Sequence, residues 1–222
     1  MQKKIVVHMY LKNGKAVTGF DGKELLEDGD VMSIAQHYSN NGADELLIFD
    51  LSDDDADHEQ SLNLIRQISR VIDIPMSGGG HIKNLEDVKK LLYAGCQQVF
   101  LNYAKAANIE LTEEVSKRFG KEKIAICTDS FAQLQANKAR VNEYTSRVIL
   151  LCDEVDVRTT ARLVEVPVLP VSTRADRHGL LKLLMLDNIC GVCGDTFSDL
   201  NEDLMAAKLE AKKHGVEINT FE

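Results

Sequence analysis

Hydrophobic residues gather in eight short runs that are spaced along the whole chain. Each run is four to eight residues long and rich in β-branched or other apolar side chains, which is typical of a buried strand in a parallel sheet. The predicted strands cover residues 4–11, 46–51, 74–77, 99–102, 123–128, 148–152, 166–171 and 189–192.

Between most of these runs lie longer segments in which apolar residues recur three and four positions apart. This spacing puts them on one face of a helix, as Val88, Leu91 and Leu92 do in the third segment. The predicted helices cover residues 31–40, 62–71, 85–93, 111–119, 132–142, 157–164, 178–186 and 203–214.

Strands that alternate with helices predict an α/β protein with a parallel sheet, and eight strands are the number that closes a (β/α)8 TIM barrel. A doubly wound open sheet is the alternative. The chain has 222 residues, which is short for such a barrel, so we expect a compact form with shortened loops. No linker-like segment divides the sequence, and residues 1–222 are predicted to form a single barrel domain.

The composition narrows the range of partners. The chain is 44% hydrophobic and 27% charged, carries a formal net charge of −9, and contains no apolar run long enough to cross a membrane. We therefore expect neither nucleic acid nor a membrane as a partner, and we predict a cytoplasmic protein. An anionic ligand would have to rely on local hydrogen-bond donors.

Five cysteines are spread along the chain, and their odd number favours free thiols over disulfides. Cys190 and Cys193 have the spacing of a redox or metal pair, but they lie at an apolar strand-like run and are interpreted as buried strand residues. The acidic residues 53–59 are most simply a solvated loop, with a metal site as the less specific alternative. We predict no cofactor and no metal.

The most informative motif is the run of residues 74–82, in which a predicted strand ends in Gly78, Gly79 and Gly80. Three glycines let a ligand approach the backbone and leave N–H groups free, and a helix is predicted to begin just behind them. Free N–H groups at a helix N-terminus bind anions, most often phosphate. A tight strand-to-helix turn without a ligand is the alternative.

Catalytic groups of a (β/α)8 barrel lie at the carboxyl ends of its strands. Asp129 is the best candidate for a general acid or base, because burial in a narrow barrel mouth can tune the pKa of a carboxylate. For any single aspartate, a helix N-cap is the simpler interpretation. The other candidates at predicted strand ends are Tyr10, Lys12, Asp50, Asn102, Tyr103, Asp153, Ser172, Arg174 and Asp195.

Several segments taken together resemble one known family. They are GADELLIFD at 42–50, IPMSGGG at 74–80, EDV at 86–88, AG at 94–95, RFG at 118–120, KKHGV at 212–216, and the strands that end at Asn102 and Asp129. The chain is similar to the histidine-biosynthesis (β/α)8 barrel family, and within it to the cyclase subunit of imidazole glycerol phosphate synthase. The resemblance is strong over residues 4–129 and weaker over 129–199.

The resemblance implies a pair of catalytic aspartates at the ends of the first and fifth strands. Asp129 matches the second of them, but Tyr10 stands in the place of the first. A phenol titrates at roughly 10 and a carboxyl at about 4, so Tyr10 is not a simple substitute.

The resemblance also implies two half-sites, one for each phosphate of a substrate that is phosphorylated at both ends. Gly78, Gly79, Gly80 and Asn102, with Tyr103 beside it, match the first half-site. The second is not matched. Ser172-Thr173-Arg174 replaces an expected Ser-Gly-Gly turn, and Asp195 adds a charge that would repel phosphate.

Three interpretations of the function follow. One is a degenerate barrel that binds a phosphorylated ribosyl small molecule at one half-site, as the domain of a fused phosphoribosyl-AMP cyclohydrolase/phosphoribosyl-ATP pyrophosphatase. Another is an active cyclase-type lyase or related isomerase, with Asp129 as the main acid or base and Asp50, Tyr10 or Lys12 assisting. The third is an interaction barrel that docks a partner such as a glutaminase.

Overall fold

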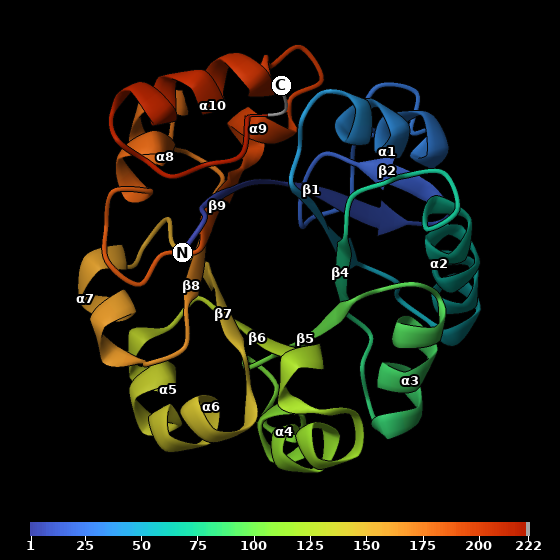
Figure 1. The fold of residues 1–222 in the computed structure, drawn as a ribbon. Coiled ribbons are helices and arrows are strands. Elements are labelled where there is room, and N and C mark those ends of the chain that lie inside the picture. The colour runs from blue at the N-terminus through green and yellow to red at the C-terminus, as the bar shows by residue number, and fades with distance from the viewer. Residues whose placement is uncertain (221–222) are drawn as a thin grey trace.

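The computed structural model describes residues 1–220 and confirms the predicted barrel. Eight parallel strands form a closed ring, because the last strand pairs with the first, and this closure rules out the open-sheet alternative. Figure 1 shows the strands as an inner ring surrounded by helices. The barrel strands are β1 (Lys4–Lys12), β3 (Glu45–Asp50), β4 (Met76–Gly79), β5 (Gln98–Asn102), β6 (Ile124–Thr128), β7 (Arg147–Leu151), β8 (Val168–Ser172) and β9 (Gly191–Gly194).

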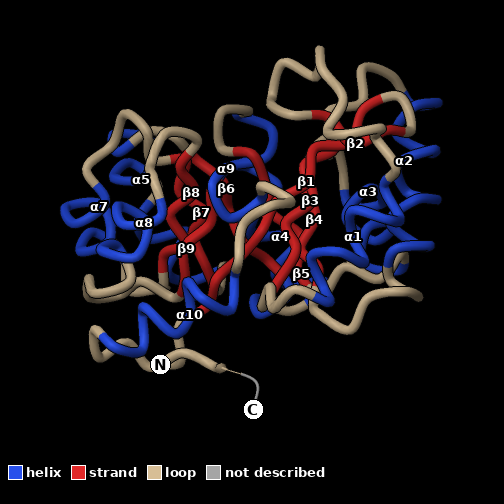
Figure 2. The backbone as a smooth tube through the Cα atoms, turned by 90° about the horizontal axis from the view of Figure 1, so that it is seen from above, coloured by secondary structure: helices blue, strands red, loops and turns tan. Residues whose placement is uncertain are grey.

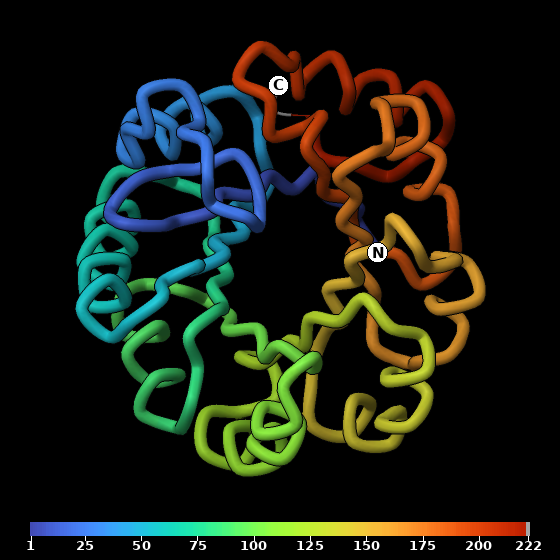
Figure 3. Tube along the Cα trace, turned by 180° about the vertical axis from the view of Figure 1, so that it is seen from behind, coloured from blue at the N-terminus to red at the C-terminus, as the bar shows by residue number. Residues whose placement is uncertain are grey.

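The helices lie outside the ring in the predicted order, but the single helix predicted over residues 132–142 is divided at Asn137. The Asn137 side chain donates to the Gln133 carbonyl at 2.9 Å and ends one helix before the next begins. Figure 3 views the ring from the other end, with the first and last segments side by side where it closes. The helices are α1 (Val31–Asn40), α2 (Asp55–Ile68), α3 (Leu85–Tyr93), α4 (Ala106–Phe119), η1 (Lys121–Lys123), α5 (Phe131–Ala136), α6 (Lys138–Tyr144), α7 (Val157–Leu163), α8 (Arg177–Leu183), α9 (Asp195–Ser198) and α10 (Leu204–Lys213). The last two residues of the predicted domain, 221–222, lie outside the described range.

The acidic segment 53–59 differs from its prediction as a solvated loop. Asp54 caps a helix by accepting a hydrogen bond from the N–H of Asp57 at 2.8 Å, so α2 begins at Asp55. Carboxylates in a first turn are favoured by the helix dipole, which is why an acidic run could start a helix here. Asp57 and His58 are buried rather than solvated.

Strand β1 continues into an additional strand, β2 (Lys15–Val17), which pairs with it in antiparallel fashion. Asn13 and Gly14 between them have φ angles of 50° and 71°, as a two-residue hairpin turn requires. Figure 2 shows this hairpin and its loop rising at the end of the barrel opposite the N-terminus. The hairpin therefore stands at the carboxyl ends of the strands, beside the barrel mouth.

Side chains alternate between an outer core, under the helices, and an inner core, inside the ring. Along β1, Ile5, Val7 and Met9 pack outward, whereas Val6 and Tyr10 pack inward. Because successive residues of a strand face opposite sides, His8 also faces inward. The inner core consists of Val6, Tyr10, Val17, Leu47, Phe49, Phe100, Ala125, Cys127, Ile149, Leu169, Val171 and Cys193.

The interpretation of Cys190 and Cys193 as buried strand residues is confirmed for Cys193 and is wrong for Cys190, which is only partly buried and lies outside the strand. Cys193 lies in β9 and is buried, Cys190 directly precedes that strand, and all five cysteines are free. Burial raises the pKa of the Cys193 thiol well above its ordinary value, which makes it a poor nucleophile. None of the helices within residues 1–220 is both long and apolar enough to cross a membrane.

Candidate functional site

The glycine run divides into two parts with different roles. Gly78 and Gly79 lie inside β4, where their backbones pair with β3 and β5. A Cβ atom on Gly79 would lie 2.2 Å from the Phe100 ring, and one on Gly78 would lie 2.8 Å from the Cys96 sulfur, so packing alone explains both glycines. The N–H groups of the following turn, residues 80–82, donate to no other residue in the described part of the chain.

The helix behind the glycines is not the one with free donors. At the start of α3, Asn84 accepts hydrogen bonds from the N–H groups of Glu86 and Asp87 at 2.9 and 3.2 Å. The carboxylate of Asp87 in turn accepts from the N–H groups of Lys83 and Asn84 at 2.8 and 3.2 Å. This reciprocal cap occupies the first donors of α3, which corrects the expectation that they face an anion.

Helix α4, instead of α3, has first N–H groups that are available to an anion. It follows Lys105 without a hydrogen bond from any capping side chain, so its first N–H groups point out of the helix. The Asn108 side chain joins this end to the glycine turn. With its amide oriented to suit both neighbours, it donates to the Ile82 carbonyl at 3.1 Å and accepts from the Asn102 N–H at 3.3 Å. Turn 80–82 and the start of α4 therefore lie side by side.

Asn102 and Tyr103 at the end of β5 differ in what they can offer a ligand. The Asn102 side-chain oxygen accepts from the Ala104 N–H at 2.9 Å, and its NH₂ group donates to no residue in the part of the chain that the structure describes. Tyr103 is fully buried, its hydroxyl bonds to that of Thr112 at 2.8 Å, and its N–H donates to the Cys127 carbonyl at 2.9 Å. Tyr103 thus links α4 to β5. Both of its donors, the hydroxyl and the backbone N–H, are already used, so neither can bind a phosphate.

The structure does not bring the four predicted catalytic residues together. Asp129 is exposed and lines a groove against α7, so it lacks the burial on which its predicted role relied. Lys12 pairs with Asp53 at 3.1 Å. Tyr10 is buried inside the barrel and lines a different cavity from Asp129.

Asp50, the fourth of these residues, is buried, and both of its carboxylate oxygens have hydrogen-bond partners. One carboxylate oxygen lies 2.5 Å from Nδ1 of His58, and the other accepts from the N–H of Ser52 at 3.1 Å and from its hydroxyl. Asp50 therefore serves as an anchor for His58.

His58 and His81 form a stacked pair that the sequence did not single out. Their ring centroids are 4.6 Å apart with planes inclined by 27°. His81 belongs to turn 80–82, has a left-handed backbone with φ of 56°, and is paired through Nε2 with Asp55 at 2.8 Å. Hydrogen bonds from His81 and Lys83 lower the pKa of Asp55 to about 2. These contacts hold the turn in place. The only feature of the sequence that could have indicated the pair was a histidine directly after the glycines.

Where the resemblance implies a second half-site, which this sequence does not match, the protein's own groups bond to one another. The Asp153 carboxylate accepts hydrogen bonds from the Ser172 hydroxyl at 2.6 Å, from the Thr173 N–H at 3.0 Å, and from the Thr173 hydroxyl at 2.5 Å. Burial alone would raise the pKa of Asp153, but these hydrogen bonds outweigh it and hold the pKa below its ordinary value. Arg174 pairs with Glu154 instead of facing a ligand.

Replacing Asp153 by alanine is expected to create an anion site at the end of β8, because the donors of Ser172 and Thr173 would lose their acceptor. Inorganic phosphate should then shift the amide resonance of Thr173 in a saturable way. Asp153→Asn is the matched control, because its side-chain oxygen still accepts these bonds. If phosphate leaves Thr173 unchanged in Asp153→Ala, an internal carboxylate is not what closes this half-site.

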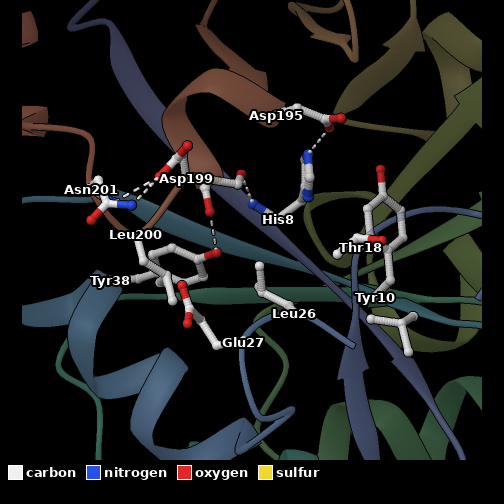
Figure 4. A pocket seen from close by; sticks show the side chains of 12 residues that line it. His8, Tyr10, Thr18, Leu26, Glu27, Tyr38, Asp195, Asp199, Leu200 and Asn201 are labelled. Atoms are coloured by element: carbon white, nitrogen blue, oxygen red, sulfur yellow. Dashed lines mark hydrogen bonds and ion pairs between the residues drawn. The ribbon is translucent and has the colours of Figure 1, made fainter. Parts of the chain in front are cut away.

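A cavity of about 250 Å³ lies where β1 meets α9 and the loop after β2. His8 reaches into it from β1, with Nε2 at 2.9 Å from the Asp195 carboxylate and its backbone N–H donating to the Ser198 hydroxyl at 2.9 Å. The Tyr38 hydroxyl donates to the Ser198 carbonyl at 2.6 Å (Figure 4). His8 was not predicted from the sequence, although its position two residues before Tyr10 on one strand was the available signal.

Comparison with known proteins agrees with this architecture. The profile of the family described as histidine biosynthesis protein matches residues 4–187. Imidazole glycerol phosphate synthase subunit HisF of Flavobacterium psychrophilum is 33% identical over 130 residues, which are 59% of this chain and 52% of that protein. The subunit of the same name from Haemophilus influenzae is 32% identical over 162 residues, 72% of this chain and 60% of that protein.

A third relative, the HisF subunit of Staphylococcus aureus, is 34% identical over 131 residues, which are 59% of this chain and 52% of that protein. The chain thus spans between about half and 60% of the length of these relatives. The profile match extends over most of the barrel and includes the glycine turn and the ends of β5 and β6. The chain therefore belongs to the histidine biosynthesis protein family.

Proposed function

We propose that this chain binds the phosphate group of a phosphorylated ribosyl compound at turn 80–82, Asn102 and the start of α4. The observation that carries the proposal is the row of N–H groups in the turn that donate to no residue among 1–220, beside a helix that has no side-chain cap. A phosphate satisfies several such donors at once and is further stabilised by the positive end of the helix dipole. The relatives named imidazole glycerol phosphate synthase supply the class of ligand.

We further propose that the barrel is a binding module and does not carry out the full cyclase-type reaction. Burial, with a smaller effect of Asp195, raises the pKa of Tyr10 far above its ordinary value, so its phenol stays protonated where a carboxylate would be needed. Asp129 is exposed, and Asp153 occupies the donors of the second half-site. These features favour a role as the barrel domain of a fused phosphoribosyl-AMP cyclohydrolase/phosphoribosyl-ATP pyrophosphatase, with a glutaminase as the alternative partner.

Titration with ribose 5-phosphate, followed by calorimetry and amide NMR, tests the site. We expect saturable binding with the largest shifts in residues 80–82 and at Ala106. Asn102→Ala should weaken binding about tenfold, since it removes a hydrogen bond to a charged group. Asn63→Ala, an exposed asparagine on the outer side of α2, is the control and should bind as the unaltered chain does.

Three outcomes would count against the proposal. Shifts that gather at Ser172 and Thr173 would place the phosphate in the other half of the mouth and favour an active enzyme. The enzyme interpretation would also gain if the chain turned over a substrate and Asp129→Asn abolished that turnover. An absence of saturable shifts in residues 80–82 would remove the phosphate site altogether.

A further inference from the structure

The ring of His81 belongs to the same turn as the N–H donors of the proposed phosphate site, and its hydrogen bonds indicate a positive charge. Nδ1 lies 3.3 Å from the Ser52 carbonyl oxygen, and Nε2 lies 2.8 Å from the Asp55 carboxylate. Both partners can only accept, because a carbonyl has no proton and Asp55, with a pKa lowered to about 2, is ionised near neutral pH. A neutral imidazole has one N–H and satisfies one of these acceptors, whereas the protonated ring satisfies both.

The neighbouring ring, that of His58, is the one that stays neutral. It stacks on His81 with a centroid distance of 4.6 Å, so two charged rings would repel each other. Its Nδ1 lies 2.5 Å from the Asp50 carboxylate, but its Nε2 is buried and has no hydrogen-bond partner among residues 1–220. A protonated His58 would bury a charged N–H group without an acceptor, which is costly. The proton of the pair therefore belongs on His81.

The charged groups around His81 make its proton count for an anion. Lys83 also pairs with Asp55, at 2.8 Å, so this carboxylate is shared between two cations when His81 is protonated. The group of three then has a net positive charge, and it has none when His81 is neutral. The nearby carboxylates of Asp50 and Asp87 are bonded to other groups in either case, the first to His58 and the second to the backbone at the start of α3.

The backbone of His81 ties its side chain to the donors of the turn. Its φ of 56° is a left-handed conformation that few residues other than glycine adopt, and surrounding contacts have to hold it. We infer that protonated His81 supplies the positive charge of the proposed phosphate site, and that His58 is the positioning residue that leaves the proton on it. This inference rests on the phosphate site proposed above.

Sulfate is the probe for this inference, because it stays doubly charged, whereas a phosphate group itself titrates at about pH 6. The affinity of the full chain for sulfate can be followed by the amide NMR signals of residues 80–82. It should fall about tenfold as the pH rises from about 5.5 to about 8.5, the range in which histidines lose their proton. Because the coupling is reciprocal, saturating sulfate should move the titration of the His81 ring signals to higher pH.

Variants and ring signals identify the two roles. His81→Asn keeps a residue that tolerates the left-handed backbone, and it should bind sulfate weakly at every pH. Asp55→Asn, at an exposed carboxylate, should lower the pH at which the affinity falls. His178→Asn, an exposed histidine of α8, is the control and should keep the pH profile of the unaltered chain. The nitrogen signals of the rings should show two N–H groups on His81 and one on His58 near pH 6.

The possible failures are distinguishable. Sulfate binding that does not change with pH, or a pH profile that persists in His81→Asn, would overturn the role of His81 and leave the phosphate site standing. Ring signals that place the second proton on His58 would overturn its role as the positioning residue. An absence of sulfate binding at residues 80–82 at every pH would overturn the phosphate site and this inference together.

Discussion

Arg147→Met is expected to lower the free energy of unfolding by about 3–5 kcal/mol, because it leaves a buried carboxylate without its partner. Arg147 opens β7 and Glu45 opens β3, so the pair reaches across the amino-terminal end of the barrel. The guanidinium donates two hydrogen bonds to the Glu45 carboxylate at 2.9 and 2.6 Å and a third to the Ser77 hydroxyl at 3.1 Å. Both side chains are less than a tenth exposed.

The loss should depend on pH with a definite sign. Burial alone would raise the pKa of Glu45, but the charge and hydrogen bonds of Arg147 outweigh it and lower the pKa to about 2. The pair therefore stabilises the fold above about 4.5, and this contribution disappears as the pH falls towards 2. In Arg147→Met the buried Glu45 carboxylate has lost this partner, so its protonation at lower pH would stabilise the folded protein. The difference between the two proteins should thus shrink as the pH is lowered from 7 to about 4.

Urea unfolding at several pH values measures this, and two controls sharpen it. Lys4→Met removes the exposed partner of Glu45, 3.3 Å away, and should cost less than about 1 kcal/mol. The double variant Glu45→Met/Arg147→Met should regain much of the loss, since no unpaired charge remains. A small cost for Arg147→Met that does not change with pH would show that the pair is solvated.

Gly80→Ala is expected to have an effect of similar size and to remove phosphate binding as well. Gly80 has a φ of +106°, a conformation that costs an alanine about 1–3 kcal/mol. A Cβ atom there would lie 2.1 Å from the Asp50 carbonyl oxygen, and overpacking of this kind costs about 1–3 kcal/mol more. The clash is with backbone at the end of β3, so the turn itself has to move away from its donor geometry.

Gly215→Ala is the matched control for Gly80→Ala. Gly215 also has a positive φ, +82°, but a Cβ atom there would have nothing within 4 Å. Its replacement should cost about 1 kcal/mol by conformation alone and leave ribose 5-phosphate binding unchanged. Thermal unfolding and calorimetry of both variants give the comparison. Equal costs at the two positions would mean that the contact between Gly80 and Asp50 does not constrain the turn.

Local patterns were enough to predict the elements of the fold. The apolar runs of the strands and the period of three to four in the helices depend only on neighbouring residues, so all eight barrel strands were found to within a few positions. The larger errors arose in the helices: the one predicted over residues 132–142 is divided at Asn137, and α2 and α4 begin earlier than predicted. Helix α2 begins seven residues before its predicted start at Leu62, because Asp54 caps it and the carboxylates of its first turn suit the dipole. An apolar stripe carries no information about such a polar first turn.

Predictions for the site were less complete for a different reason. The sequence shows which residues stand at strand ends, but it does not show which of their donors are already used. The amides of α3 are taken by Asn84 and Asp87, and the donors of Tyr103 are taken by Thr112 and Cys127. Each of these hydrogen bonds uses a donor that a ligand would need. The residue therefore lies at the site but cannot bind the ligand.

The sequence by itself determined the barrel, its similarity to a family, and the position of the glycine turn beside Asn102. Each of these depends on residues that are close together in the sequence. Only the tertiary structure decided that Asp153 occupies the donors of Ser172 and Thr173, which lie at the end of the neighbouring strand but 19 and 20 residues away in sequence. It also decided that His8 meets Asp195, 187 residues later. That contact exists because β9 closes the ring against β1, and ring closure is a property of the whole sheet that no segment carries alone.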